Sequence, residues 1–208
     1  KADVRTVILI LQKGKSYQSR VKVLNRPSNT AALKDALSKQ CFLDVELENI
    51  TLSKKKNSNQ FIVDVDKEVL HLFKNDRIGQ IYNCVTGIST GNDKKYLSKE
   101  LKNGFSIPFY KNPGSRKFKT TPDAYLIDHF LDESIDVKDF MVRNKQFIGR
   151  KGITCSSMGL PFSACYLPEN STFGVNPNIF LPEQDLFWVL SYLNSSLVTY
   201  LVRGVLIR

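Results

Sequence analysis

The sequence has 208 residues, of which 42% are hydrophobic and 24% are charged. This length fits one medium domain, or one domain with part of another, and the composition is typical of a soluble globular chain that buries a core. The formal net charge of +10 favours a polyanionic partner, either a nucleic acid or an acidic membrane surface, and does not distinguish between them.

The cysteines argue against a structural zinc site. Cys41, Cys84, Cys155 and Cys165 include no CxxC pair, and the chain has only two histidines. A structural zinc ion needs four ligands, which usually come in close pairs. We therefore expect no metal, and we expect reduced thiols in a cytoplasmic protein.

The first part of the chain alternates between strand and helix patterns. Runs of β-branched or alternating apolar residues predict strands, and Pro27 to Thr30 supplies a helix start before an apolar stripe that ends at Leu37. A basic loop at 54–59 is either a solvated turn or a phosphate contact. The predicted strands are 5–11, 19–24, 42–47 and 61–63, and a second helix is predicted at 66–73.

From Gly79 onward the chain is predicted to be rich in short strands and long loops. Short apolar segments alternate with Gly, Pro, Asn and Ser about every ten residues, and such loops can present side chains to a partner. A long amphipathic helix from about Asp185 to Leu201 packs on the core. The fold class is therefore α+β, with short mixed sheets, long loops and packing helices. The segments are 105–109, 124–127, 146–150, 153–157, 162–166 and 178–181.

The stretch 85–97 is the first candidate for anion binding. Apolar residues lead into a turn in which Gly91 and Asn92 tolerate positive φ and leave backbone N–H groups exposed. Lys94 and Lys95 follow the bend, beside a turn that can approach an anion closely. The alternative interpretation is an ordinary hairpin tip with solubilising lysines.

Two further clusters interleave cations with aromatic residues and hydroxyls. Such side chains can contact phosphates, read base edges or stack on a displaced base, although an ordinary basic surface has the same composition. The first cluster has Tyr110, Arg116 and Lys117 around Gly114, and the second has Arg150, Lys151, Gly152, Ser156 and Ser157.

No catalytic set is apparent in the sequence. Asp93-Lys94-Lys95 and Asp136-Val137-Lys138 both match the short half of a metal-dependent nuclease motif. Two unrelated matches in one chain show that this pattern discriminates poorly, and exposed ion pairs are the ordinary explanation. We predict no catalytic residue and keep a nuclease site as an alternative.

Six stretches, taken in order, resemble one protein family. The family is the C-terminal target-recognition region of N6-adenine DNA methyltransferases from type II restriction–modification systems, including enzymes that fuse restriction and methylation. Residues 2–13 look like the last strands of the methyltransferase domain that precedes this region. The stretches are 87–92 (GISTGN), 108–117 (PFYKNPGSRK), 150–154 (RKGIT), 162–168 (FSACYLP), 179–180 (IF) and 190–195, with LxxLNS.

The resemblance implies a division of labour within a longer enzyme. Residues 1–24 would end the methyltransferase domain, and residues 25–208 would form a DNA target-recognition domain that is truncated at its C-terminus. The family's Asn/Asp-Pro-Pro-Tyr/Phe motif and its S-adenosylmethionine motif are expected upstream of Lys1. The fragment alone is then expected to bind no cofactor and transfer no methyl group, and its partners are double-stranded DNA and the upstream domain, with no membrane.

The resemblance also implies which residues contact the bases or the backbone of DNA. Gly87, Gly91, Gly114 and Gly152 are expected to shape the loops that carry these contact residues. The predicted contacts are Thr90, Asn92, Lys94, Lys95, Tyr110, Arg116, Lys117, Arg150, Lys151, Ser156 and Ser157.

Three alternatives stay open. A type I restriction specificity subunit also reads DNA without catalytic motifs, but such subunits usually contain two similar halves and this chain has no internal repeat. An endonuclease domain would nick DNA with a metal ion. An interaction module would have no nucleic-acid role.

Overall fold

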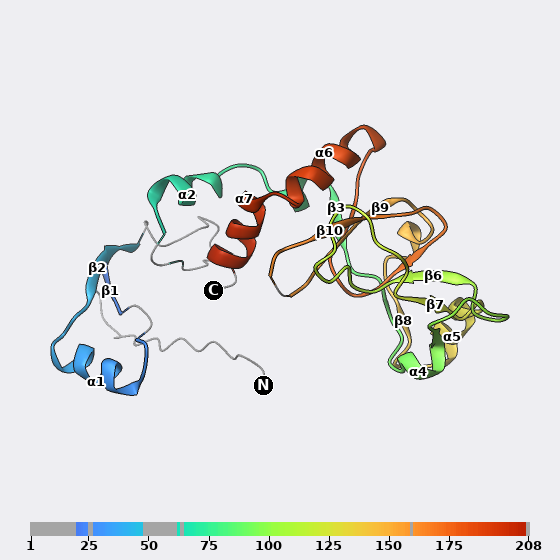
Figure 1. Cartoon of the computed structure of the whole chain (residues 1–208), viewed down its shortest axis with the longest axis horizontal. Coiled ribbons are helices and arrows are strands. Elements are labelled where there is room, and N and C mark those ends of the chain that lie inside the picture. Colours follow the sequence, from blue (N-terminus) through green and yellow to red (C-terminus); the bar gives the residue numbers. More distant parts are fainter. Residues whose placement is uncertain (1–19, 25–26, 48–61, 63–64, 159, 207–208) are drawn as a thin grey trace. The chain divides into compact units, whose positions relative to one another are not determined.

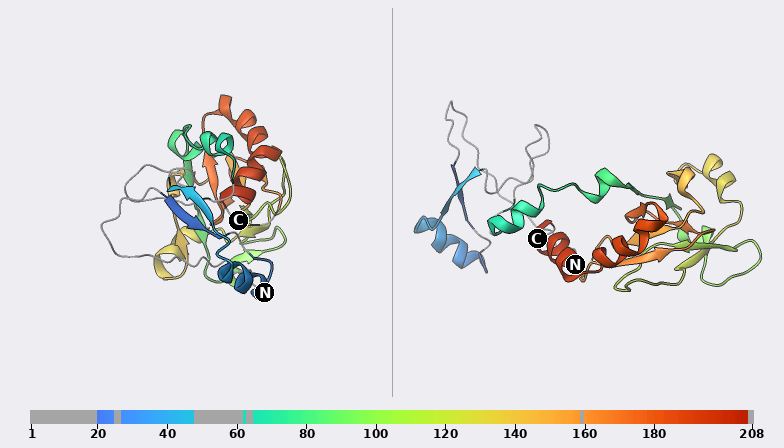
Figure 2. Two further views of the ribbon diagram at one scale, coloured as in Figure 1. Left: turned by 90° about the vertical axis from the view of Figure 1, so that its left-hand side faces the viewer. Right: turned by 90° about the horizontal axis from the view of Figure 1, so that it is seen from above.

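A computed structural model describes residues 20–24, 27–47, 62, 65–158 and 160–206. The chain divides into two compact units, Lys1–Asp76 and Arg77–Ile207 (Figure 1; Figure 2 gives two further views). Several small sheets combine with short helices, so the fold class is α+β, as predicted. The predicted strand at 5–11 and the basic loop at 54–59 lie outside the described residues.

The described residues of the first unit form a two-stranded antiparallel sheet and two helices. Strands β1 (Arg20–Val23) and β2 (Leu43–Glu46) pair along their whole length. Helix α1 (Thr30–Ser38) begins where the Asn29 side chain accepts a hydrogen bond from the backbone of the first turn, which is the usual way to start a helix. Helix α2 (Lys67–Leu72) follows. These elements confirm the strands predicted at 19–24 and 42–47 and both predicted helices.

The first sheet of the second unit is antiparallel throughout, in the order β10-β9-β12-β3. Helix α6 (Glu183–Leu193) covers one face, because Leu186, Val189, Leu190 and Leu193 all point toward the strands. The strands are β3 (Asn83–Val85), β9 (Gly152–Cys155), β10 (Ala164–Leu167) and β12 (Asn178–Phe180). The short helix α3 (Ile78–Ile81) precedes β3.

The second sheet has the order β11-β6-β7-β5, with β11 parallel to β6 and the other pairs antiparallel. Phe109, Leu126 and Phe140 build its core together with helices α4 (Asp93–Tyr96) and α5 (Phe130–Asp136). A separate strand pair joins β4 (Ile88–Ser89) to β8 (Met141–Val142). The sheet strands are β5 (Leu97–Ser98), β6 (Ile107–Tyr110), β7 (Ala124–Leu126) and β11 (Thr172–Phe173).

A small aromatic cluster joins the two sheets of the second unit. Tyr110 and Phe173 come from the second sheet, and Leu167 and Phe180 come from the first. The rings of Phe173 and Phe180 lie with their centroids 5.1 Å apart. Gly87 fits against this cluster so closely that a Cβ atom there would lie 2.1 Å from the Phe173 carbonyl oxygen. Gly87 therefore does more than shape a loop, since it allows the two sheets to meet.

No strand forms at 146–150, where the sequence pattern predicted one. Residues Lys145–Phe147 instead form a 3-10 turn, which starts after Asn144 at φ 53° and is followed by Gly149 at φ 79°. These left-handed backbone conformations at both ends prevent the extended geometry that a strand needs.

The C-terminal helix is also interrupted, although the apolar stripe predicted one long helix to Leu201. Helix α6 ends at Leu193, and the Asn194 side chain then accepts from the Ala164 N–H (3.1 Å) and donates to the Ala164 carbonyl (2.8 Å). Ser195 caps the next short helix, α7 (Ser196–Thr199), and a π-helical segment, Tyr200–Leu206, follows. Among the described residues, no helix is long and apolar enough to cross a bilayer.

Gly87→Ala is expected to lower the free energy of unfolding by about 3 kcal/mol, because the added methyl group overlaps the Phe173 backbone. The matched control is Gly79→Ala in helix α3, where the nearest atom to a new Cβ is the Cys84 sulfur at 3.8 Å. That variant is expected to be neutral or to gain up to about 1 kcal/mol. Urea unfolding curves measure both, and equal effects would contradict the assigned contact.

Candidate nucleic-acid interface

The stretch 85–97 forms a turn that leads into a helix and is not a simple hairpin tip. Strand β4 pairs with β8 and not with the strand that follows it in sequence. Gly91 takes φ +66°, and a Cβ atom there would lie 2.8 Å from that of Asp139, so both the conformation and the packing require glycine. The Asn92 side chain accepts from the Lys95 N–H at 3.2 Å and starts α4.

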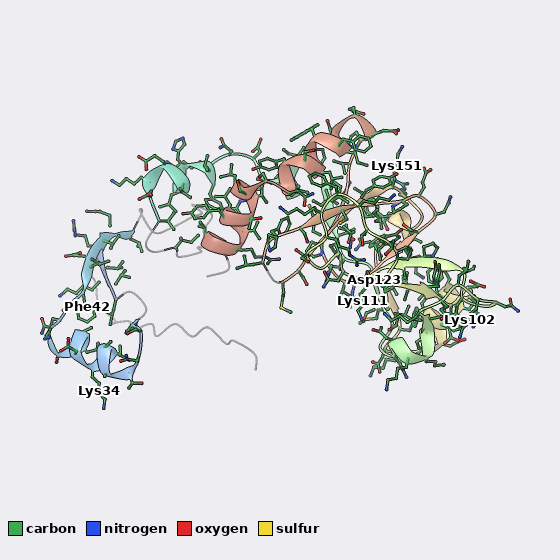
Figure 3. The ribbon with its side chains drawn as sticks, viewed as in Figure 1. Lys34, Phe42, Lys102, Lys111, Asp123 and Lys151 are labelled. Atoms are coloured by element: carbon green, nitrogen blue, oxygen red, sulfur yellow. The ribbon has the colours of Figure 1, made fainter. Side chains whose placement is uncertain are left out.

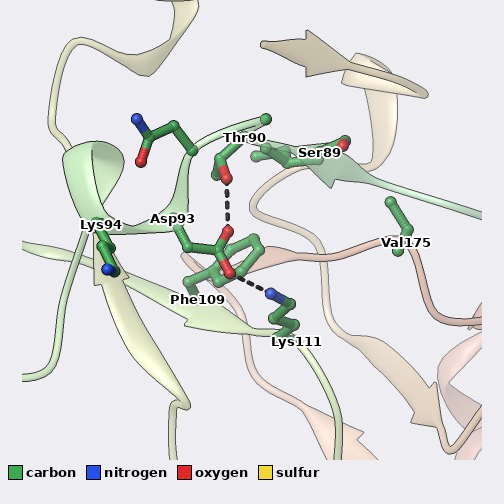
Figure 4. A pocket seen from close by; sticks show the side chains of 10 residues that line it. Ser89, Thr90, Asp93, Lys94, Phe109, Lys111 and Val175 are labelled. Atoms are coloured by element: carbon green, nitrogen blue, oxygen red, sulfur yellow. Dashed lines mark hydrogen bonds and ion pairs between the residues drawn. The ribbon is translucent and has the colours of Figure 1, made fainter. Parts of the chain in front are cut away.

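This turn lines a shallow pocket of about 480 Å³, which we call the β4–α4 pocket (Figure 4). The seven residues from Ile88 to Lys94 form most of it, and Phe109, Lys111 and Val175 complete it. Phe109 supplies an apolar floor from strand β6. The predicted anion-binding turn is therefore open to a partner, and Lys111, which directly follows β6, adds a second lysine to the pocket.

A buried hydroxyl and a lysine hold the carboxylate of Asp93 inside the pocket. The Thr90 Oγ1 donates to Asp93 Oδ1 at 2.6 Å, and the Lys111 ammonium pairs with Oδ2 (Figure 4). Partial burial alone would raise the pKa of Asp93, but the hydrogen bonds from Lys111 and Thr90 and the charges of Lys111 and Lys99 outweigh it. The pKa of this carboxyl is lowered, so it is ionised at neutral pH.

Lys94 and Lys95 have different surroundings, although they are neighbours on α4. Lys94 is exposed and makes no hydrogen bond or ion pair with any residue that the structure describes. Lys95 donates to the hydroxyl of Tyr96 at 2.8 Å and lies 3.8 Å from Glu133 of α5. The hydrogen bond to Tyr96 and the charge of Glu133 raise the pKa of Lys95. Of these two lysines, Lys94 is the one that can bind an anion without giving up a partner among the described residues.

The loop after β6 holds Arg116 in place. The carboxylate of Asp123 accepts from the backbone N–H of Lys111 at 2.6 Å and of Asn112 at 2.9 Å, and from the Arg116 guanidinium at 3.2 Å. Lys111 and Asp123 lie together in Figure 3. Gly114 takes φ +64° within this loop, so it shapes the turn as predicted.

The remaining predicted cations contact helix α6 or an aromatic ring. Lys117 donates to the Asn194 carbonyl at the C-terminal end of α6 (2.9 Å), and Lys151 pairs with Glu183 at its first residue (2.6 Å). Arg150 lies over the Phe147 ring at 5.7 Å. Since Lys117 and Lys151 mark opposite ends of one helix, the predicted cations do not all gather around the β4–α4 pocket.

Three predicted DNA contacts are buried and must be corrected. Thr90, Tyr110 and Ser156 have 4%, 6% and 1% of their surface exposed, so their side chains cannot reach a partner in this conformation. Thr90 supports Asp93, Tyr110 packs between the sheets, and the Ser156 hydroxyl accepts from the Ser163 N–H at 3.1 Å. Ser157 is exposed, and its predicted contact with DNA stays a prediction.

The expected role of Gly152 also needs correction, because it lies inside strand β9. A Cβ atom there would be 2.7 Å from the Ile179 carbonyl, so this glycine allows strand β12 to pack closely and does not shape a loop. Gly152 thus belongs to the scaffold.

Sequence reasoning missed Asp93 and Lys111 as members of the site. In the sequence, Asp93 lies in the turn at 85–97 and forms half of a nuclease pattern, and neither feature predicts it as a contact residue. The spacing Thr90-x-x-Asp93 at the start of a helix is a signal for a local side-chain pair, whereas Lys111 is 18 residues away and has no such signal. Among the described residues, no group of three or more His, Cys, Asp or Glu side chains could hold a metal ion.

Two of the four thiols are buried in the first sheet of the second unit. Burial raises the pKa of Cys155 to about 12 and that of Cys165 to about 11. Cys41 and Cys84 are exposed, although partial burial raises the pKa of Cys84 as well. A thiolate is the reactive form, so the buried pair are poor nucleophiles.

Models of known protein families do not match the chain, and no curated protein matches its sequence. The resemblance to DNA target-recognition regions therefore stays a prediction that depends on the order of its motifs.

Iodoacetamide at pH 8 is expected to label Cys41 and, more slowly, Cys84 in the native protein and all four cysteines after denaturation, because Cys155 and Cys165 are protonated and shielded. Peptide mass spectrometry reads out each site. Rapid native labelling of Cys155 would show that the first sheet opens.

Proposed function

We propose that the second unit is a sequence-specific DNA-recognition domain of a site-specific adenine-N6 methyltransferase, and that it contacts DNA through the β4–α4 pocket. The observation that carries this proposal is the exposed Lys94, which has no ion-pair or hydrogen-bond partner among the described residues and lies beside a glycine turn in an open pocket that also contains Lys111. Backbone N–H groups and ammonium groups are the usual contacts to DNA phosphates.

The other exposed polar side chains would extend the contact on either side of the pocket. Lys95, Arg116, Lys117 and Lys151 have internal partners at present. Ion pairs near the surface contribute little to stability, on the order of 0–1 kcal/mol, so Lys95, Arg116 and Lys151 can each exchange a carboxylate for a phosphate at small cost. Lys117 would instead give up its hydrogen bond to the Asn194 carbonyl. Asn92, Arg150 and Ser157 are exposed as well.

The proposed role is to hold duplex DNA against a catalytic domain. Moving an adenine out of the helix costs a few kcal/mol, and contacts of the recognition domain would compensate for that cost. S-adenosylmethionine would bind to the catalytic domain, since the sequence contains neither the family's cofactor motif nor its Asn-Pro-Pro-Tyr motif. A cytoplasmic location is part of the same proposal.

Lys94→Glu is expected to weaken binding of the full chain to duplex DNA by about tenfold at low salt and to lower the slope of log affinity against log salt by about one. The matched control is Lys34→Glu on α1 (labelled in Figure 3), which changes the net charge equally and is also exposed. Fluorescence anisotropy across a salt series measures both.

Equal loss of affinity in the two variants would show that only net charge matters and that the pocket is not the contact face. No binding of the unmodified chain at low salt would remove the DNA-recognition proposal and favour an interaction module. Nicking of the duplex in the presence of Mg²⁺ would favour the endonuclease alternative.

A further inference from the structure

Asp93 is an unexpected residue for a surface that binds a polyanion. Of the ten residues that line the β4–α4 pocket, all of them described, it is the one acid. A carboxylate repels DNA phosphates at close range, and the energy of that repulsion grows as water leaves the interface. Its presence at the centre of the pocket therefore requires a compensating role.

The carboxylate of Asp93 is held in position but is not saturated. Its side chain is 49% exposed, and each oxygen receives one hydrogen bond, from Thr90 on one side and from Lys111 on the other. An ionised carboxylate has about four acceptor positions, so about two stay available. Asp93 can therefore accept a further hydrogen bond from a partner without losing either support.

Thr90 and Lys111 fix the orientation of the Asp93 carboxylate. Thr90 is 4% exposed, so its hydroxyl is fixed by packing and donates to Asp93 at 2.6 Å. Lys111 comes from the end of a different strand and reaches the other oxygen. A group that is fixed from two elements has the geometry that base recognition demands, because a misplaced acceptor gives no discrimination.

Protein carboxylates have one principal use in base recognition. They accept a hydrogen bond from an exocyclic amino group, and cytosine presents such a group (N4) in the major groove. Phosphates offer only acceptors, so they cannot pair with an ionised Asp93. Lys111 partly offsets the charge of Asp93, and the adjacent Lys94 can bind the backbone on the same side.

We propose that Asp93 is a base-reading residue that accepts a hydrogen bond from the exocyclic amino group of a base in the recognised site, with cytosine N4 as the favoured donor. This inference depends on the proposed DNA-recognition function of the same pocket and names its specificity-determining residue. Lys94 supplies affinity, and Asp93 supplies selectivity.

Substitutions of Lys94 and of Asp93 are expected to change DNA binding in opposite ways. Asp93→Asn replaces one acceptor oxygen by an amide donor and removes a negative charge. Overall affinity for random duplex DNA should therefore stay the same or rise, whereas the preference for the amino-bearing base at one position should fall about tenfold or more. A residue that only holds Lys111 in place would not alter the preference at a single position.

The experiment is a selection from a library of random duplexes with the full chain, followed by sequencing of the bound fraction. Asp128→Asn is the matched control, because Asp128 also accepts two hydrogen bonds, both from Ser106, and lies outside the pocket. Unmodified protein and Asp128→Asn are expected to enrich the same sequence. Asp93→Asn is expected to lose the preference for cytosine, or for adenine through its own amino group, at one position.

Thr90→Val provides a second test should Asp93→Asn fail to fold, as judged by circular dichroism. It leaves the carboxylate in place but removes one of its supports, so the same position should lose selectivity to a smaller extent. An unchanged base preference in the folded variants, or no base preference in the unmodified protein, would overturn the assignment of Asp93. Absence of any DNA binding by the unmodified protein would instead reject the DNA-recognition function itself.

Discussion

The close contact between Gly87 and Phe173 determines how the second unit is arranged. Gly87 lies between β3, which belongs to the first sheet, and β4, which leads into the pocket, and its N–H donates to the Gly174 carbonyl at 2.9 Å. Because no side chain intervenes, the chain passes directly over an aromatic residue of the second sheet. The turn that follows is thereby fixed beside Phe109 and Lys111, so the pocket depends on this crossing.

The distribution of partners among the cations explains why net charge alone locates no binding surface. Lys117 and Lys151 contact helix α6, Arg116 holds its own loop, and Lys95 links α4 to α5. Their positive charge still contributes to the long-range field that attracts a polyanion. Lys94 differs from them because it has no partner in the part of the chain that the structure describes, so it can bind an anion without a rearrangement.

Local patterns in the sequence were enough to predict several elements but not their long-range partners. The alternation at 19–24 and the capped start at Asn29 predicted β1 and α1, because both signals come from neighbouring residues. The end of α6 could not be predicted in this way, since Asn194 pairs with Ala164, which is 30 residues away.

The candidate site was predictable to a similar extent. The turn at 90–94 and its glycine were identified from residue types, and they line an open pocket in the structure. Tyr110 and Ser156 are residue types common in DNA contacts, but tertiary packing buries both, which composition does not reveal. The Asp93–Lys111 pair joins a helix start to a strand end and follows from the fold alone.

The side chain of Asn194 has one more consequence, which concerns the edge strand of the first sheet. Strand β10 is the last strand on that side, and its Ala164 amide and carbonyl are occupied by Asn194, while the backbone of Phe118 bonds to Ala164 and Tyr166. An exposed edge strand can pair with a strand of another molecule, which leads to β-augmentation or self-association. Here a carboxamide imitates a neighbouring peptide group, so along this stretch the sheet accepts no additional strand from another molecule.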